Sequence, residues 1–127
     1  MNDLKALSIR PDYVIDILTG DKTSEFRSWN TKHRGDLLIC STAQRIPGTM
    51  PGHALCVVQI VDVIQLGPKS YEWKFGQDGY YIRPFQVKGR QHLFNVDDDL
   101  IIKDNGDDET TEESEAWIKR YWDPLYV

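Results

Sequence analysis

Hydrophobic and polar positions along this chain change their period several times, and each change marks a predicted element. Residues 4–9 form a short apolar stretch typical of a strand. Residues 11–19 instead place apolar side chains at helical spacing. Pro11 suits the first turn of a helix, and Gly20 suits the residue that closes one. We therefore expect a strand followed directly by a helix.

Three further segments have the patterns of strands. Residues 22–29 alternate with a period of two, which places Glu25 and Arg27 on the same face. Residues 36–40 form a nearly continuous apolar run, which indicates a strand buried on both faces. Residues 53–66 are rich in β-branched side chains and predict one long strand or two bent ones.

Turn residues divide the next part of the chain. Residues 67–79 contain several glycines and a proline, so we expect a loop or a short helical excursion there. Residues 80–87 and 90–96 are predicted strands, joined by a hairpin or a sharp corner at residues 88–89. Pro84 cannot donate a ladder hydrogen bond, so its strand should be an edge or interrupted strand.

The C-terminal part carries a helix pattern. Thr110 and Glu113 fit a capping box, and residues 112–123 predict a short aromatic-rich helix that docks on the body. One early helix, one late helix and about five to seven short strands in 127 residues predict a single α+β domain. We expect a small mixed β-barrel with its core at about residues 4–96. Periodicity alone does not separate such a barrel from an OB-fold or another α+β arrangement.

Composition narrows the class of protein. The apolar fraction of 40% and the charged fraction of 28% are those of a soluble globular domain. No apolar run reaches the roughly 18 residues of a membrane span, and the first residues lack a signal-peptide pattern, so we expect a cytoplasmic protein. Cys40 and Cys56 lie in apolar runs without metal-ligand spacing, which predicts buried, reduced thiols. We expect no metal and no cofactor, and for the oligomeric state, which the sequence does not establish, a monomer.

Charge is distributed unevenly along the chain. The net charge is −5, but residues 97–115 hold ten acidic residues and one lysine, so the rest of the chain carries +4. This acidic segment is either a solvated loop that aids solubility or a segment that competes with phosphate ligands for a basic cleft.

One motif favours a particular family. Residues 20–29, Gly-Asp-Lys-Thr-Ser-Glu-Phe-Arg-Ser-Trp, follow the predicted helix and contain the pattern Gly-x-Lys-x-x-Glu-x-Arg. Residues 87–94, Val-Lys-Gly-Arg-Gln-His-Leu-Phe, are similar to a second pattern, Gly-(Lys/Arg)-Gln-Gly-Leu-(Trp/Phe). With these two segments, residues 4–96 resemble the ASCH family (activating signal cointegrator homology) of the PUA-like superfamily.

The resemblance implies a PUA-like barrel with a cleft near the first motif, suited to RNA or modified nucleotides. Some relatives are described as nucleic-acid binders, one branch as amidohydrolases acting on an acetylated cytidine, and one as ribonucleases. The amidohydrolase branch has a Thr, thought to be its nucleophile, where this chain has Glu25. That difference speaks against amide hydrolysis by the same scheme. His92 is a second departure, because many relatives have Gly there.

The candidate site centres on the first motif. Lys22, at the corner between helix and strand, can serve as a point charge for phosphate or, if desolvated, as a base. Glu25 and Arg27 can either form a structural ion pair or both address a ligand. The further candidates for nucleic-acid contact are cations for phosphate, aromatic rings for stacking and one hydroxyl: Arg10, Arg83, Lys88 and Arg90; Trp29, Tyr80 and Tyr81; and Ser41.

Three functions remain open at this point. The preferred one is a module that binds RNA or a nucleotide-like ligand through a cationic cleft. The second is an enzyme on RNA or a modified nucleoside, a ribonuclease or an amidohydrolase-like hydrolase, with Lys22 and Glu25 as acid and base and His92 as a weaker candidate. The third is a protein-interaction module that uses the acidic segment.

Overall fold

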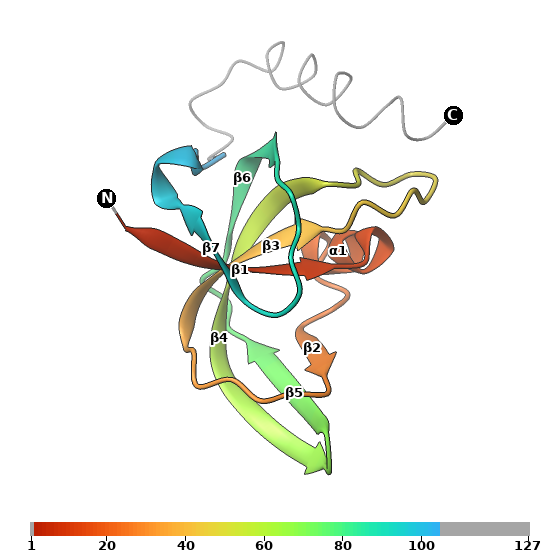
Figure 1. Cartoon of the computed structure of the whole chain (residues 1–127), viewed down its shortest axis with the longest axis vertical. Coiled ribbons are helices and arrows are strands. Elements are labelled where there is room, and N and C mark those ends of the chain that lie inside the picture. The colour runs from red at the N-terminus through yellow and green to blue at the C-terminus, as the bar shows by residue number, and fades with distance from the viewer. Residues whose placement is uncertain (1, 105–127) are drawn as a thin grey trace.

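A computed structural model describes residues 2–104, which form one sheet, one α-helix and a short 3-10 helix (Figure 1). The elements are β1 (Asp3–Ile9), α1 (Pro11–Leu18), β2 (Ser24–Arg27), β3 (Gly35–Ser41), β4 (His53–Gly67), β5 (Ser70–Phe75), β6 (Tyr80–Gln86), β7 (Phe94–Asp97) and η1 (Asp98–Leu100). The helix predicted at residues 112–123 and most of the acidic segment lie outside the described residues.

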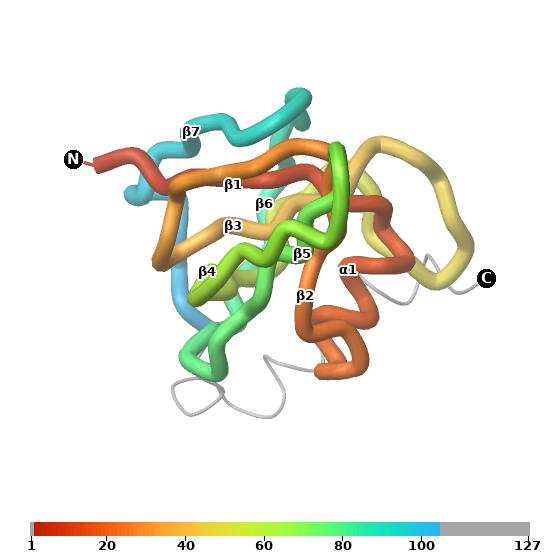
Figure 2. The backbone as a smooth tube through the Cα atoms, turned by 90° about the horizontal axis from the view of Figure 1, so that it is seen from below, coloured from red at the N-terminus to blue at the C-terminus, as the bar shows by residue number. Residues whose placement is uncertain are grey.

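All seven strands belong to one mixed sheet. The path runs β2-β5-β4-β3-β1-β7, and β6 pairs with β4 off this path. Strands β1 and β3 are parallel, and the other pairs are antiparallel. Figure 2 shows β1 and β3 running side by side.

The sheet is open, so the prediction of a closed β-barrel was wrong. Strand β4 explains the difference, because its first half pairs with β6 and its second half with β5. Strands β5 and β6 therefore occupy different parts of one edge of β4. Strand β6 contains Pro84, as expected of an edge strand, and within residues 2–104 its pairing beyond β4 is one isolated bridge, from Ile82 to Lys103. The end strands, β2 and β7, have four residues each and do not pair with each other in the described part of the chain.

Strand β3 separates two apolar clusters, as its continuous apolar run predicted. Leu37 and Ile39 belong to the cluster that includes Val14 of α1. Leu38 and Cys40 face the opposite cluster. A strand covered on both faces shows this uninterrupted apolar pattern because neither set of alternating side chains meets water.

Two predictions about the strands need correction. Residues 67–79, expected to be a loop or a helical excursion, contain β5. Residues 80–87 and 90–96 do not form a hairpin, because β6 pairs with β4 and β7 pairs with β1.

Both cysteines are buried, in agreement with the sequence. Burial raises the pKa of Cys40 to about 12, with a smaller contribution from the neighbouring Cys56, and burial likewise raises the pKa of Cys56 to about 12. Such thiols stay protonated and unreactive near neutral pH. Within residues 2–104, none of the helices has the length and apolar character needed to cross a membrane.

Candidate nucleic-acid interface

The end of α1 fixes where the first motif begins. The carbonyls at the end of a helix lack donors within the helix, and each of the last four in α1 accepts a hydrogen bond. The carbonyls of Ile15, Asp16, Ile17 and Leu18 accept hydrogen bonds from the amides of Thr19, Lys22 and Gly20 and from the hydroxyl of Tyr81, in that order. Gly20 has φ 85°, a left-handed conformation that glycine adopts at little cost. Lys22 is therefore held directly behind the helix, at the start of the path to β2.

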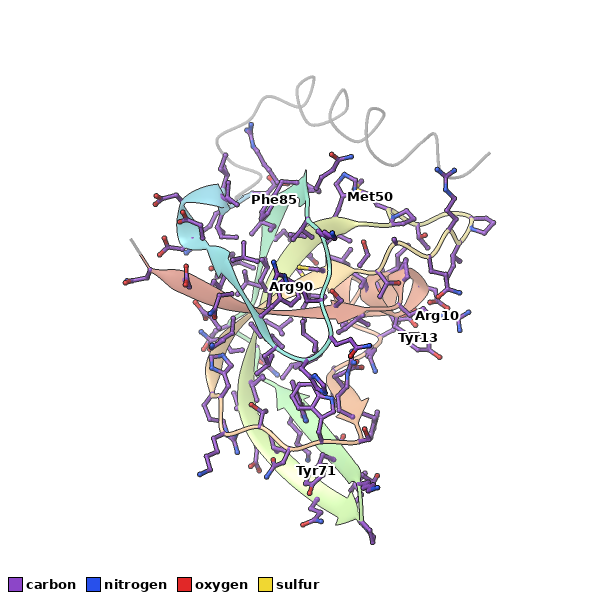
Figure 3. The ribbon with its side chains drawn as sticks, viewed as in Figure 1. Arg10, Tyr13, Met50, Tyr71, Phe85 and Arg90 are labelled. Atoms are coloured by element: carbon purple, nitrogen blue, oxygen red, sulfur yellow. The ribbon has the colours of Figure 1, made fainter. Side chains whose placement is uncertain are left out.

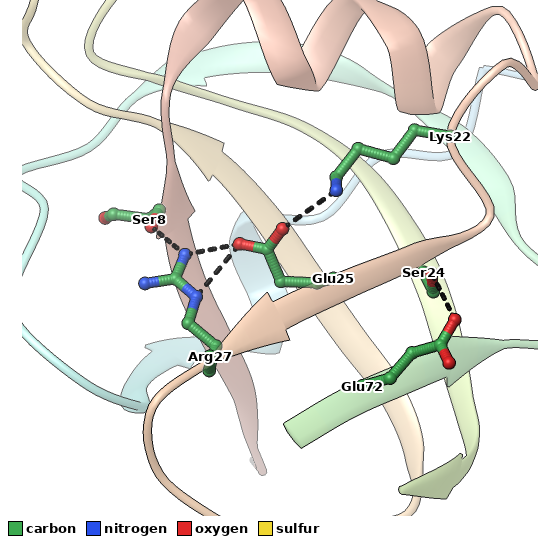
Figure 4. Close-up of polar contacts among 6 residues, drawn as sticks. All are labelled: Ser8, Lys22, Ser24, Glu25, Arg27 and Glu72. Carbon is green, nitrogen blue, oxygen red and sulfur yellow. Dashed lines mark hydrogen bonds and ion pairs between the residues drawn. The ribbon is translucent and has the colours of Figure 1, made fainter. Parts of the chain in front are cut away.

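The centre of the site is a carboxylate between two cations (Figure 4). Glu25 is only 6% exposed, and its Oε1 lies 3.1 Å from Lys22 Nζ. Its Oε2 lies 2.7 Å from Arg27 Nη2 and accepts a hydrogen bond from Arg27 Nε at 2.9 Å. Arg27 Nη2 also donates to the carbonyl of Ser8 on β1, at 2.9 Å. Glu25 and Arg27 thus form the structural ion pair considered above, and the group of three keeps one net positive charge.

Two exposed aromatic rings flank Lys22. Its Nζ lies 5.6 Å from the centroid of the Tyr13 ring and 5.5 Å from that of Phe26. These side chains are 46% and 57% exposed. Arg10 lies over the same Tyr13 ring, at 5.6 Å, and pairs with Asp12 at 2.9 Å. Figure 3 shows Arg10 and Tyr13 next to each other beside α1. We call Arg10, Tyr13, Lys22, Phe26 and Arg27 the cationic–aromatic patch.

Tyr13 and Phe26 were not among the residues proposed from the sequence. A signal for Phe26 was present, because the alternation of residues 22–29 places it on the face opposite the buried Glu25. Tyr13 lies on α1, and the structure leaves almost half of its side chain exposed.

The segment between β6 and β7 brings further cations toward the patch. A Cβ at Gly89 would lie 2.6 Å from Ser8 Oγ, so a larger residue there would have to displace the Ser8 side chain. Ser8 is also the residue whose carbonyl binds Arg27. Lys88 and Arg90, on either side of Gly89, are exposed. The backbone of Gly89 therefore lies against Ser8 near the Arg27 end of the patch, and an exposed cation stands on each side of it in the chain.

The remaining candidates lie elsewhere. Ser41 is 1% exposed, and its hydroxyl donates to the carbonyl of Met50 and accepts from the amide of His53, so it fastens the loop between β3 and β4. Arg83 lies on β6, where its amide donates to the carbonyl of Ile102. Trp29 is partly buried against the core, with its ring centroid 4.7 Å from that of Trp73. The structure does not bring these three residues into the patch.

A comparison with protein families identifies the family of the chain. The model described as the ASCH domain matches residues 7–122, nearly the whole chain. The chain belongs to the ASCH domain family. The match includes every residue of the cationic–aromatic patch and extends well beyond the core expected at residues 4–96. No curated protein sequence matches the chain.

The structure also explains the departure from the ASCH pattern at His92. His92 has φ 61°, in the left-handed region that favours glycine. Its ring packs edge-on against Trp29, with 4.9 Å between centroids. A glycine at this position avoids the backbone strain but cannot make the ring contact.

We therefore expect His92→Gly to be more stable than His92→Ala by about 1 kcal/mol, because both lose the ring and only alanine keeps the strain. Urea unfolding of the two variants measures the difference. Gln91, whose φ is not positive, is the control. There alanine should be more stable than glycine. Equal stability of the two His92 variants would contradict a strained backbone at this position.

Proposed function

We propose that the cationic–aromatic patch binds single-stranded RNA or a nucleotide-like ligand. The observation that carries the proposal is the position of Lys22, whose ammonium group lies between two exposed rings and beside a carboxylate that Arg27 also neutralises. Proteins that bind single strands combine cations that follow the backbone with aromatic rings on which bases stack. The patch supplies both kinds of group within one small area.

The charge of the patch supports an anionic ligand. Arg10, Lys22 and Arg27 are opposed by two carboxylates, those of Asp12 and Glu25. Lys88 and Arg90 add two positive charges at one end. Lysine and arginine side chains contact phosphate oxygens without reading base identity. We therefore expect binding with little sequence preference from the patch itself.

The enzyme hypothesis is less well supported by the geometry. A general base needs an oxygen that can accept a proton from the substrate. Both oxygens of Glu25 instead accept from cationic donors. The interaction hypothesis depends on an acidic segment that lies mostly outside the described residues, so binding of RNA or a nucleotide is the function that we retain.

The rings provide the first test. We expect Phe26→Ala and Tyr13→Ala each to weaken binding of a labelled single-stranded RNA of eight nucleotides by roughly 5- to 150-fold, the equivalent of 1–3 kcal/mol per stacked base. Fluorescence anisotropy at low salt measures the affinity.

Leu66→Ala is the matched control. Leu66 is an exposed apolar residue on β4, comparable in exposure to Phe26, and it is not part of the patch. Its replacement should leave the affinity unchanged. Unchanged affinity in Phe26→Ala and Tyr13→Ala, or an equal loss in all three variants, would overturn the proposal.

A further inference from the structure

A cavity lies next to the patch and differs from it in chemistry. It has a volume of about 560 Å³ and opens between the end of α1, the middle of β4 and the segment that joins β5 to β6. Ile17, Val57, Val58 and Phe75 contribute apolar walls, while Thr19 and Gln77 contribute polar groups. Its size and its mixture of apolar walls with a few polar groups are those of small-molecule sites.

Lys22 connects the cavity to the patch. Among the described residues that line the cavity, it is the one that carries a charge. Its ammonium is already paired with Glu25 at 3.1 Å. Apart from Lys22, the described lining of the cavity is uncharged, so a neutral group would meet apolar walls and hydrogen-bonding edges there. The cavity thus suits an uncharged part of a ligand, while the patch supplies the cations.

Tyr81 spans two walls of the cavity. It lines the β6 side, and its hydroxyl donates at 2.8 Å to the carbonyl of Leu18, which lines the α1 side. Tyr81 is 55% exposed, so an aromatic surface is available at the edge of the cavity. The adjacent Tyr80 also lines it, and burial, with a smaller contribution from Asp36, raises the pKa of Tyr80. A tyrosine hydroxyl is neutral near pH 7 even without this shift, so Tyr80 adds no charge to the cavity.

We infer that this cavity holds one neutral, planar heteroaromatic group, namely a single unstacked nucleobase, with Tyr81 as its stacking surface. Proteins that recognise RNA commonly take bases out of the stack and place them on aromatic side chains. In the RNA complex, the base would enter the cavity while the neighbouring phosphates lie on the cationic–aromatic patch. That arrangement rests on the proposed function, but binding of a free nucleoside to the cavity does not.

Nucleosides test the inference because they contain the base without phosphate. We would titrate adenosine, guanosine, cytidine and uridine separately into the ¹⁵N-labelled full chain and follow amide shifts by NMR. At least one nucleoside should shift residues that line the cavity, including the side-chain amide of Gln77, with an affinity that is insensitive to salt. Absence of such shifts for all four nucleosides would overturn the inference.

Variants separate the cavity from the patch. Tyr81→Ala should weaken nucleoside binding by roughly 5- to 150-fold, as expected for loss of one stacking ring. Tyr81→Phe, which removes only the hydroxyl, should retain most of the affinity. Tyr13→Ala should leave nucleoside binding unchanged while it weakens RNA binding. Equal nucleoside affinity in Tyr81→Ala and the wild type would refute Tyr81 as the stacking surface.

A second pair of variants covers a failure of Tyr81→Ala to fold, which circular dichroism would reveal. Gln77→Ala removes an exposed polar group of the cavity and should weaken nucleoside binding, whereas Gln65→Ala, at an exposed position on β4, should not. Equal nucleoside affinity in these two variants would count against the cavity.

The two ligands separate the two proposals. Nucleoside binding without RNA binding would support the cavity and refute the function proposed for the patch. RNA binding without nucleoside binding would support the patch and refute the cavity.

Discussion

Replacing Glu25 by glutamine will destabilise the protein by about 3 kcal/mol, because it leaves two cations beside a buried amide. Removing one partner from a buried ion pair typically costs 3–5 kcal/mol. The lower end applies here, since the side chains of Lys22 and Arg27 are 19% and 25% exposed and water screens part of their repulsion. Urea unfolding at pH 7 measures the change in the free energy of unfolding.

Glu72 supplies the matched control for this change. It lies on β5, next to β2, and accepts a hydrogen bond from Ser24 at 2.9 Å, but it forms no ion pair among the described residues (Figure 4). Glu72→Gln should therefore cost less than about 1 kcal/mol. If Glu25→Gln were as stable as Glu72→Gln, Glu25 would not be the group that holds Lys22 and Arg27 together.

The second large effect concerns Trp73, the fully buried residue opposite Glu25 in the β2–β5 pairing. Trp73→Ala should destabilise the protein by roughly 3–5 kcal/mol, as expected for a large aromatic residue removed from a core. It also removes the ring against which Trp29 packs, at 4.7 Å. Since Trp29 in turn contacts His92, the change should loosen the segment that carries Lys88 and Arg90.

Thermal and urea unfolding of Trp73→Ala measure its stability, and Phe26→Ala is the comparison. Phe26 is an aromatic residue of the adjacent strand that is more than half exposed, so its loss should change the free energy of unfolding by less than about 1 kcal/mol. A Trp73→Ala variant within 1 kcal/mol of the wild type would contradict its position at the centre of the core.

Elements with a local period could be predicted from the sequence, and pairings between distant segments could not. The helix at residues 11–18 and the doubly buried strand at residues 35–41 were visible because their side-chain periods depend only on neighbouring residues. Strand β5 also alternates, with Trp73 buried and Glu72 and Lys74 toward solvent. Its flanking glycines and proline concealed this short pattern, since the same residues are typical of loops.

The hairpin or sharp corner expected at residues 88–89 depended on the interpretation of Gly89 as a turn residue. In the structure Gly89 also lies close to β1, where an added Cβ would come within 2.6 Å of Ser8 Oγ. Glycine serves both purposes, and only the tertiary contact distinguishes them. Strand β7 consequently pairs with β1, at one end of an open sheet, and not with the strand before it.

The candidate site was predictable where a motif defined it. The motif identified Lys22, Glu25 and Arg27, which the structure brings together on one carboxylate. Tyr13 and Phe26 were missed because neither stands at a fixed position of the motif. Ser41 was misplaced for the opposite reason: a hydroxyl at a strand end suggests a cleft, but here it satisfies loop backbone.

The most direct test of the cationic–aromatic patch is the salt dependence of RNA affinity. For single-stranded RNA, the slope of log K against log salt concentration is about −0.7 for each phosphate that is neutralised. We predict a clearly negative slope for the wild type between about 50 and 200 mM KCl, and a slope about 0.7 shallower for a folded Lys22→Ala variant. A wild-type slope near zero, or the same slope in both proteins, would contradict the account.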